Sequence, residues 1–426
     1  MQGFLGFLKK VSYNGKKGGD SMRTQADQIV KQAIQAVLPD AAVKRALETE
    51  NFPGRVILVA AGKAAWQMAN CAWNTLGDQI SQGIVITKYD HSQGPIGHLA
   101  IREAGHPIPD ENSFAATGEA LDLVKGLTAE DTVLFLLSGG GSALFEVPLI
   151  PGAELQDITA QLLSCGAEIT QINTLRKRLS AVKGGKFAQA CAPARVFAIV
   201  LSDIIGDPLD MIASGPAYPD SSTCQQALAI ARNYNLRLSP LAWECLAQET
   251  PKGLSNVTTR ITGSVRELCA AAAEAVRSLG YTPQILTDTL SCEAKDAGSW
   301  LAKLAREAQG QKVALIAGGE TVVKLTGTGK GGRNQELALS AAAGIEGMDH
   351  VCIFSVGSDG TDGPTDAAGG YVDGNTAKQL RDMGIDIADV LRQNDAYHAL
   401  QKIGGLIITG PTGTNVNDVA VALIEN

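Results

Sequence analysis

Short apolar segments, each followed at once by a turn rich in glycine and polar residues, constrain the fold of this chain most strongly. Strands that are apolar along their whole length are typical of parallel sheets covered by helices on both faces. The stretches between these segments carry apolar residues at helical spacing. The pattern predicts an α/β fold with a mostly parallel sheet. The predicted strands include residues 55–61, 83–87, 132–137, 195–201, 311–317, 351–356 and 405–409.

The 426 residues of the chain predict two domains, because a single hydrophobic core rarely grows to that size. A helical stretch with many loops, from Pro219 to about Asn256, is the predicted junction. We therefore place an N-terminal domain at residues 22–240 and a C-terminal domain at residues 241–426.

Residues 1–21 are expected to be a non-native or disordered extension. The codons of Lys17-Gly18-Gly19 can contain a bacterial ribosome-binding sequence, a short distance before the codon of Met22. Met22 is therefore the expected physiological start. A genuine disordered or helical extension is the alternative.

Charge and composition argue against several classes of function. The formal net charge of −8 disfavours nucleic acid as a partner, because contacts to phosphate backbones need a concentrated basic face. No apolar run approaches the roughly 18 residues of a membrane span, so no membrane association is expected. The 5 histidines include no H-E-x-x-H motif, which disfavours zinc. The 8 cysteines form no C-x-x-C pair and predict reduced thiols in the cytoplasm.

The turn after residues 132–137 is a predicted anion site, because ligands of such sheets bind outside the carboxyl ends of the strands. It reads SGGGS and precedes a helix start. Its backbone N–H groups can converge on an anion, so we expect it to bind phosphate or a nucleotide. A tight turn without a ligand is the alternative. The residues of this turn are Ser138, Gly139, Gly140, Gly141 and Ser142.

Two lysines are further candidates. Lys63 follows the first strand and begins a helix, where its charge opposes the helix dipole. We expect Lys63 to neutralise a phosphoryl or carboxylate group, and a solvated surface lysine is the alternative. Lys183 belongs to a basic segment at residues 171–187 and is expected near phosphates, although a solvated basic helix face is equally consistent. The other cations of that segment are Arg176, Lys177, Arg178 and Lys186.

Two loops that follow strands are rich in aspartate, and carboxylate oxygens are ligands that Mg²⁺ prefers. Asp203 comes shortly after the strand at residues 195–201, and we expect it to act as a general base or to hold Mg²⁺. For most of the other aspartates the expected role is to cap turns and helices. They are Asp207, Asp210, Asp359, Asp362 and Asp366.

Gly327, Gly329 and Gly332 match the dinucleotide fingerprint G-x-G-x-x-G. The fingerprint also needs a long helix and an acidic residue about 20 positions later, at the end of the next strand. The helix predicted after Gly332 is short, and the next acidic strand end, Asp359, lies farther on. Arg333 follows the glycines directly and suits an oxyanion. We therefore predict a loop for phosphate or carboxylate and not for a dinucleotide.

Six blocks in order along the chain resemble the glycerate 2-kinase family, whose C-terminal module is called MOFRL. The blocks are SGGGSALF, INTLRKRLSAVKGGKFA, SDIIGDPLDMIASGP, GGETVVKLTGTGKGGRNQE, GSDGTDGPTDAAGG and GPTGTNVND. The resemblance implies a Rossmann-like N-terminal domain and a smaller α/β MOFRL domain, with the active site in the cleft between them. It implies transfer of a phosphoryl group from ATP, with Mg²⁺, to the 2-hydroxyl of D-glycerate, giving 2-phosphoglycerate.

The resemblance also implies roles for single residues. Lys63 and Arg333 match the catalytic lysine and arginine of the family and are expected to contact the substrate. Asp203 matches the functional aspartate, and Asn415 matches the substrate-binding asparagine, although Asn417 lies two positions on. Ala217 stands where the family usually has threonine, which puts a hydroxyl role there in doubt.

Two other functions stay open from the sequence. Members of this family have carried the name hydroxypyruvate reductase, and the GTGKGG loop superficially fits an enzyme that uses NAD(P)H. A protein that binds a phosphorylated metabolite without catalysis is the other alternative. A monomer or a homodimer is expected.

Overall fold

The computed structural model describes residues 21–48, 50–202 and 209–425. Asp203, Asp207 and the predicted extension up to residue 20 lie outside the described residues. The chain divides into two compact units: unit 1 is Met1–Leu38 with Ser264–Asn426, and unit 2 is Pro39–Gly263. This division differs from the predicted domains at residues 22–240 and 241–426.

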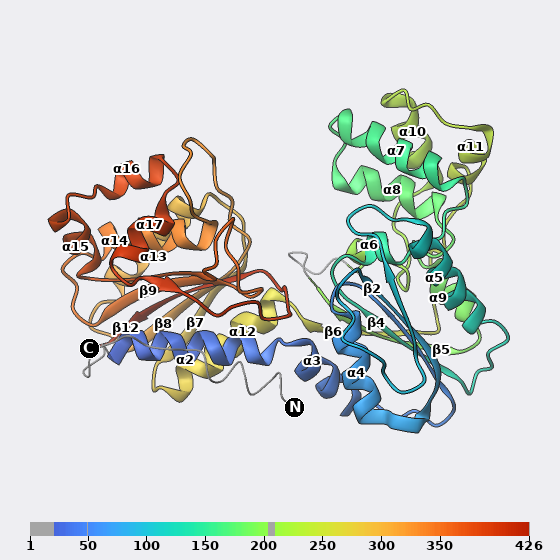
Figure 1. Ribbon diagram of the computed structural model, residues 1–426, viewed down its shortest axis with the longest axis horizontal. Coiled ribbons are helices and arrows are strands. Elements are labelled where there is room, and N and C mark those ends of the chain that lie inside the picture. Colours follow the sequence, from blue (N-terminus) through green and yellow to red (C-terminus); the bar gives the residue numbers. More distant parts are fainter. Residues whose placement is uncertain (1–20, 49, 203–208, 426) are drawn as a thin grey trace. The chain divides into compact units, whose positions relative to one another are not determined.

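Unit 2 is an α/β unit with helices on its sheet (Figure 1). Its strands are β1 (Val56–Ala61), β2 (Ile80–Lys88), β3 (Ala100–Ala104), β4 (Thr132–Leu137), β5 (Arg195–Leu201) and β6 (Val257–Gly263). Its α-helices are α3 (Pro39–Glu48), α4 (Ala65–Leu76), α5 (Glu111–Leu123), α6 (Gly141–Leu144), α7 (Gly152–Ser164), α8 (Ile169–Leu179), α9 (Lys186–Cys191), α10 (Cys224–Asn233) and α11 (Pro240–Leu246). Its 3₁₀ helices are η1 (Gly77–Gln79) and η2 (Ile212–Ser214).

The sheet of unit 2 has the order β3-β2-β1-β4-β5-β6, and all its strand pairs are parallel. The direction of winding reverses between β1 and β4, which is where ligands bind in Rossmann-like sheets. Ala61, at the end of β1, pairs with Ile86 on one side and with Leu137 on the other. The turns that follow these strands therefore lie side by side. The predicted Rossmann-like unit with a mostly parallel sheet is confirmed.

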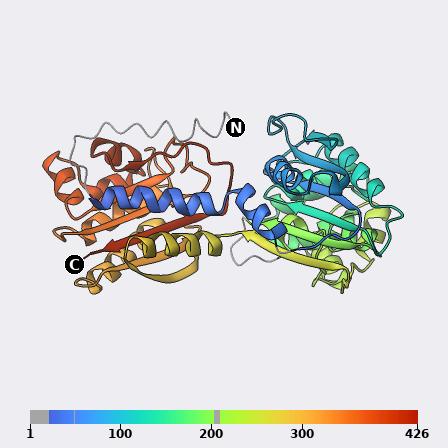
Figure 2. The ribbon, with the colours of Figure 1, turned by 90° about the horizontal axis from the view of Figure 1, so that it is seen from below.

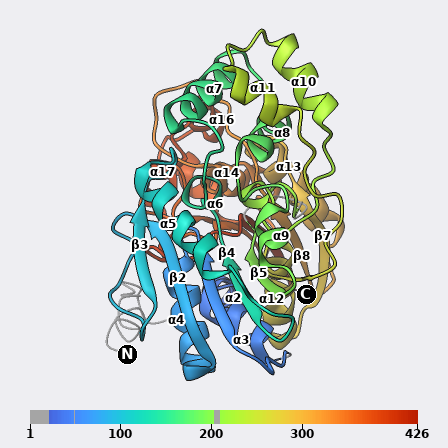
Figure 3. The same ribbon diagram turned by 90° about the vertical axis from the view of Figure 1, so that its right-hand side faces the viewer.

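Helices α7, α8, α10 and α11 form a separate cluster within unit 2 (Figure 3). Buried apolar residues such as Leu162, Leu175, Ala227 and Leu246 pack together there. β6 then extends the unit to Gly263 by pairing with β5. The predicted junction from Pro219 to Asn256 is therefore wrong, because this stretch packs into the core of unit 2 instead of linking two units.

Unit 1 contains a second sheet with helices (Figure 1). Its strands are β7 (Thr282–Leu290), β8 (Val313–Gly319), β9 (Val351–Gly357), β10 (Gly369–Asp373), β11 (Leu406–Ile407) and β12 (Asp418–Ile424). Its helices are α2 (Ser21–Ala36), α12 (Val265–Ser278), α13 (Ala294–Glu307), α14 (Arg333–Gly344), α15 (Thr376–Asp382), α16 (Ile387–Arg392) and α17 (Ala396–Lys402).

The sheet of unit 1 is mixed, with the order β11-β10-β9-β12-β8-β7. β12 is buried along its whole length and lies antiparallel between β8 and β9. β7 and β8 are parallel, with α13 between them in the chain. The last strand of the chain thus fills the middle of a sheet whose other strands precede it by many residues.

Helix α2 belongs to unit 1, although the sequence places it in the N-terminal domain. Its buried face, including Ile29, Ala33 and Val37, joins the core formed with Leu268 and Ala272 of α12. Figure 2 shows the blue helix α2 beside the yellow α12. The apolar spacing predicts the helix correctly, but the surface that covers its apolar face is more than 200 residues away in the chain.

None of the helices in the described ranges has both the length and the apolar character needed to cross a membrane.

All eight cysteines are free. Burial raises the pKa of the Cys191 and Cys269 thiols to about 12, so these two thiols stay protonated and unreactive.

Candidate functional site

Residues at the ends of β1 and β4 lock the two neighbouring turns together. The backbone N–H of Lys63 donates to the carbonyl of Gly139 at 2.9 Å, and that of Ala64 donates to Ser138 Oγ at 3.1 Å. A Cβ atom on Gly62 would lie only 2.2 Å from Ser138 Oγ, so this close approach requires glycine. Ser138 is buried and serves the turn itself.

The glycine-rich turn presents free donors at the sheet edge. Gly140 has a φ of 86°, in the left-handed region that favours glycine, and a Cβ on Gly141 would lie 2.8 Å from that of Ala213. The backbone N–H groups of Gly139, Gly140 and Ser142 donate to no other described residue. These three residues are half-exposed, so their N–H groups can receive an anion. Anion binding at the turn stays a prediction.

Cationic and imidazole side chains surround this turn at the same edge of the sheet. Lys63 is exposed, and His91 Nδ1 lies 3.2 Å from its backbone carbonyl oxygen. The ring of His106, which follows β3, lies against Gly140. Burial lowers the pKa of His106, and the charges of Lys63, Lys88 and His91 lower it further. The edge is therefore positively charged and suited to an anionic substrate.

Neither histidine is among the predicted site residues. Their positions shortly after strands are the signal in the sequence that points to them. His91 follows β2 and His106 follows β3, and the ligand edge of a parallel sheet is built from such positions.

Lys183 supports the turn from within the protein. It is fully buried, and its ammonium donates to the carbonyls of Ser142 and Phe145, both at 2.9 Å. Glu146 lies 3.3 Å away, and burial lowers the pKa of Lys183 to about 8. The prediction that Lys183 contacts a nucleotide is therefore corrected, because its Nζ is directed at protein oxygens and has no path to solvent.

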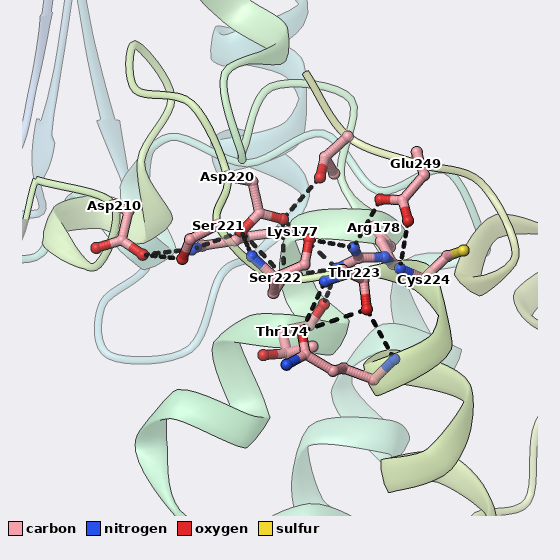
Figure 4. Close-up of polar contacts among 12 residues, drawn as sticks. Thr174, Lys177, Arg178, Asp210, Asp220, Ser221, Ser222, Thr223, Cys224 and Glu249 are labelled. Atoms are coloured by element: carbon pink, nitrogen blue, oxygen red, sulfur yellow. Dashed lines mark hydrogen bonds and ion pairs between the residues drawn. The ribbon is translucent and has the colours of Figure 1, made fainter. Parts of the chain in front are cut away.

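Lys177 and Arg178 form a buried ionic network, which neither predicted role for the basic segment anticipates. Figure 4 shows Asp220 between the two cations, at 3.1 Å from Lys177 Nζ and 3.5 Å from Arg178 Nη1. Thr250 donates to the same carboxylate at 2.7 Å. Glu249 pairs with Arg178 at 3.3 Å. Lys177 and Arg178 are buried, so they do not form a solvated helix face. Their ion pairs join α8 to the segments that carry Asp220 and Glu249.

Replacing Asp220 by alanine is expected to lower the free energy of unfolding by about 3–5 kcal/mol, because two buried cations lose their shared carboxylate. Asp157→Ala is the matched control, since its carboxylate is exposed and 3.9 Å from Arg237. That control should cost less than about 1 kcal/mol. Urea unfolding followed by circular dichroism measures both. Equal, small losses would contradict the role of the network.

Arg333, the first residue of α14, is held by carboxylates. Its Nε lies 2.5 Å from Asp418 Oδ2 and its Nη2 lies 3.0 Å from Asp418 Oδ1, a bidentate pair. Its Nη1 lies 3.1 Å from Glu320 Oε1. Asp418 begins β12, where burial raises its pKa and Arg333 opposes the rise. Asp418 is not among the predicted site residues. The sequence feature that points to it is its place in the block GPTGTNVND, three positions after Asn415.

The carboxylate of Asp362 occupies the N-terminus of α14. Its two oxygens accept the backbone N–H groups of Asn334 at 3.1 Å and Gln335 at 2.8 Å. A Cβ on Gly332 would lie 2.3 Å from Asp362 Oδ1. The prediction that this loop binds a phosphate or carboxylate of a ligand is corrected, because the carboxyl group of Asp362 already occupies the helix end.

The remaining fingerprint glycines pack against the protein and leave no room for a ligand. A Cβ on Gly327 would lie 2.4 Å from the Cα of Gln393, and one on Gly329 would lie 2.5 Å from Asp395 Cβ. A dinucleotide fingerprint needs glycines that face the pyrophosphate and a free helix N-terminus. The prediction that GTGKGG is not a dinucleotide motif agrees with this geometry.

The pH dependence of stability provides a test of the Asp362 cap. Burial raises the pKa of Asp362 from 3.8 to about 7, so the folded state binds a proton that the unfolded state has released. The resulting stabilisation is fully present below pH 3.8 and is lost as the pH rises through about 7. The melting temperature of the wild-type protein should therefore fall relative to that of Asp362→Asn between about pH 4 and 7, and the difference should stop changing above about pH 7. Parallel pH profiles would refute the assignment.

Three other predicted residues form hydrogen bonds with groups of the protein. Asp359 accepts the N–H of Thr361 at 2.9 Å, and Asp366 accepts the Tyr397 hydroxyl at 2.7 Å. Asn415 is exposed, and its Oδ1 accepts the N–H of Asn417 at 3.3 Å. The expected capping role is confirmed for Asp359, whereas Asp366 accepts from a side chain of α17. Substrate binding by Asn415 stays a prediction.

A metal site built from three or more His, Cys, Asp or Glu side chains is absent from the described part of the chain. Asp203 is the carboxylate that we expect to serve Mg²⁺ or as a base, and it lies outside that part. Both roles of Asp203 stay predictions.

Comparisons with known proteins connect both units to one group of enzymes. Residues 25–247 match a domain of unknown function (DUF4147), and residues 313–418 match the MOFRL family. The chain is 53% identical to a D-glycerate 2-kinase of Thermotoga maritima over 413 residues, covering 95% of this chain and 99% of the relative. It is 39% identical to an Agrobacterium vitis protein provisionally named hydroxypyruvate reductase, covering 87% and 100%.

A solved structure of a glycerate kinase has the same fold as this chain. The crystal structure of a glycerate kinase from Thermotoga maritima superimposes with a TM-score of 0.92 at 52% sequence identity. The superposition covers 96% of this chain and 100% of that one.

Proposed function

This chain belongs to the glycerate 2-kinase family, and from that premise we propose that it transfers the γ-phosphoryl group of ATP to the 2-hydroxyl of D-glycerate, giving 2-phosphoglycerate. The resemblance carried by the six sequence blocks is thereby confirmed. The observation that best supports the proposed reaction is the edge of unit 2, where free N–H groups of Gly139 and Gly140 lie beside the exposed Lys63.

Phosphoryl transfer needs positioning and charge stabilisation more than covalent chemistry. We assign the ammonium of Lys63 to an oxyanion of glycerate or of the transferring phosphoryl group. The N–H groups of Gly139, Gly140 and Ser142 bind an anion of the same reactants. Mg²⁺ enters as its complex with ATP and belongs to the substrate, and Asp203 is the carboxylate proposed to meet it.

Arg333 is the second cation of the proposal. Asp418 holds its Nε and Nη2 in a fixed plane, and its Nη1 pairs with Glu320, whose side chain is 47% exposed. An ion pair this exposed contributes little, so a substrate oxyanion can replace Glu320 at Nη1. The side chain of Asn415 is proposed to donate a hydrogen bond to the substrate.

The test is an assay of purified protein with ATP, Mg²⁺ and D-glycerate. We expect ADP release that depends on glycerate, and ³¹P and ¹³C NMR of the product should show the phosphate on the 2-oxygen. Phosphate on the 3-oxygen would overturn the proposed position, and no ADP release with D-glycerate would overturn the proposed kinase.

Reduction of hydroxypyruvate is the rival function, and the name of the Agrobacterium vitis relative favours it. The geometry of unit 1 argues against it, because Asp362 occupies the N-terminus of α14 that would receive the pyrophosphate. Oxidation of NADPH by the protein with hydroxypyruvate would support the reductase. A binding protein without catalysis would take up a phosphorylated metabolite and release no ADP.

We further propose a cytoplasmic protein that is a monomer or a homodimer. The eight free cysteines are consistent with a reducing compartment. Analytical ultracentrifugation measures the oligomeric state.

A further inference from the structure

We propose that His106 accepts the proton of the hydroxyl group that is phosphorylated, an inference that rests on the proposed kinase function. His106 follows β3 by two residues and is half-buried. Its ring lies against the glycine-rich turn: a Cβ built on Gly140 would be 3.0 Å from His106 Cδ2 and 3.2 Å from His106 Nε2. The same Cβ built on Gly140 would be 3.2 Å from Lys63 Cγ. The imidazole and the lysine therefore both lie against Gly140.

The position of the reacting hydroxyl follows from the chemistry of the substrate. The 2-hydroxyl is on the carbon next to the carboxylate, and its oxygen attacks the γ-phosphorus of ATP. It therefore lies within about one hydrogen-bond length of either anion that the turn can hold. Because His106 and Lys63 both lie against Gly140, we place the hydroxyl of a reactant held by this turn beside the ring of His106.

The surroundings of His106 keep its imidazole neutral and able to accept a proton. Lys63 after β1, Lys88 at the end of β2 and His91 after β2 are the titratable groups that act on it. Burial and then these positive charges lower the pKa of His106, which favours the neutral ring. Within the described residues, His106 makes no hydrogen bond that would occupy a ring nitrogen.

The proposed step conserves atoms and charge. The hydroxyl proton moves to an imidazole nitrogen of His106 as the new O–P bond forms. The bond between the γ-phosphorus and the bridging oxygen breaks, and ADP leaves with that electron pair. The imidazolium then releases its proton to solvent. Removal of a positioned base of this kind costs about 10²–10⁴ in rate.

The experiment compares His106→Asn and His106→Ala with the wild-type protein over a range of pH. We expect kcat to fall by about 100-fold or more, with KM for D-glycerate changed by less than about 5-fold. The decline of kcat at acidic pH should disappear in both variants, and added imidazole should partly restore the activity of His106→Ala. His98→Asn is the matched control, because His98 is exposed and only packs edge-on against Trp73.

Three outcomes would overturn the inference. A kcat within about 3-fold of wild type removes any catalytic role. A large loss with the acidic decline preserved and no rescue by imidazole indicates a role in packing. A loss as large in His98→Asn shows that the effect is not specific. Failure of the kinase proposal is distinguishable, because the wild-type protein would then release no ADP with D-glycerate. Melting temperatures show whether each variant is folded.

Discussion

Replacing Lys63 by alanine is expected to lower kcat for glycerate phosphorylation by about 100-fold or more, while the free energy of unfolding stays within about 1 kcal/mol. The side chain is exposed, so its loss removes little packing. The contact that fixes the turn uses the backbone N–H of Lys63, which donates to Gly139 at 2.9 Å and is present in the variant. The ammonium is therefore free to act on charge that develops in the transition state.

Lys125→Ala is the control for this prediction. Lys125 is an exposed lysine of the same unit, and its ammonium lies 2.5 Å from Asp122. Its loss should leave kcat unchanged. Steady-state kinetics and thermal melting of both variants provide the comparison. Near-normal turnover in Lys63→Ala would return Lys63 to the role of a solvated surface residue.

Arg333→Lys is expected to lose nearly as much turnover as Arg333→Ala, also about 100-fold. The guanidinium contacts three carboxylate oxygens at once, two on Asp418 and one on Glu320. A lysine ammonium is a point charge on a flexible stem, and it cannot hold Asp418 through two parallel bonds while presenting a third donor. Charge alone should therefore not restore the activity.

The two variants should differ in stability. Arg333→Ala leaves the buried Asp418 without its cation and should lower the melting temperature, whereas Arg333→Lys keeps a positive charge beside it. Arg266→Lys serves as the control, because Arg266 is exposed and pairs with Asp288 through Nε. The bidentate role is wrong if Arg333→Lys keeps most of the wild-type kcat under conditions where it is folded.

Local sequence patterns predicted seven of the strands in the described residues, and they predicted the edge of the sheet where the candidate site lies. All seven predicted strands are present, because runs such as that of residues 132–137 are apolar enough to be buried wherever they pack. The position of Lys63 and of the SGGGS turn at one edge follows from the same pattern, since the carboxyl ends of parallel strands meet there. Six motifs in order were also sufficient to indicate the family.

Tertiary structure alone decided which distant groups meet. Helix α2 joins unit 1 because its apolar face is covered by α12, and no local signal shows which surface will cover such a face. The same holds for charges: Lys177 is neutralised by Asp220, Arg333 by Asp418, and the N-terminus of α14 by Asp362. A charge is tolerated in the interior only when an opposite charge or hydrogen-bond partner is in contact with it. The sequence shows which residues carry charge, but the order of the strands decides which of them come together.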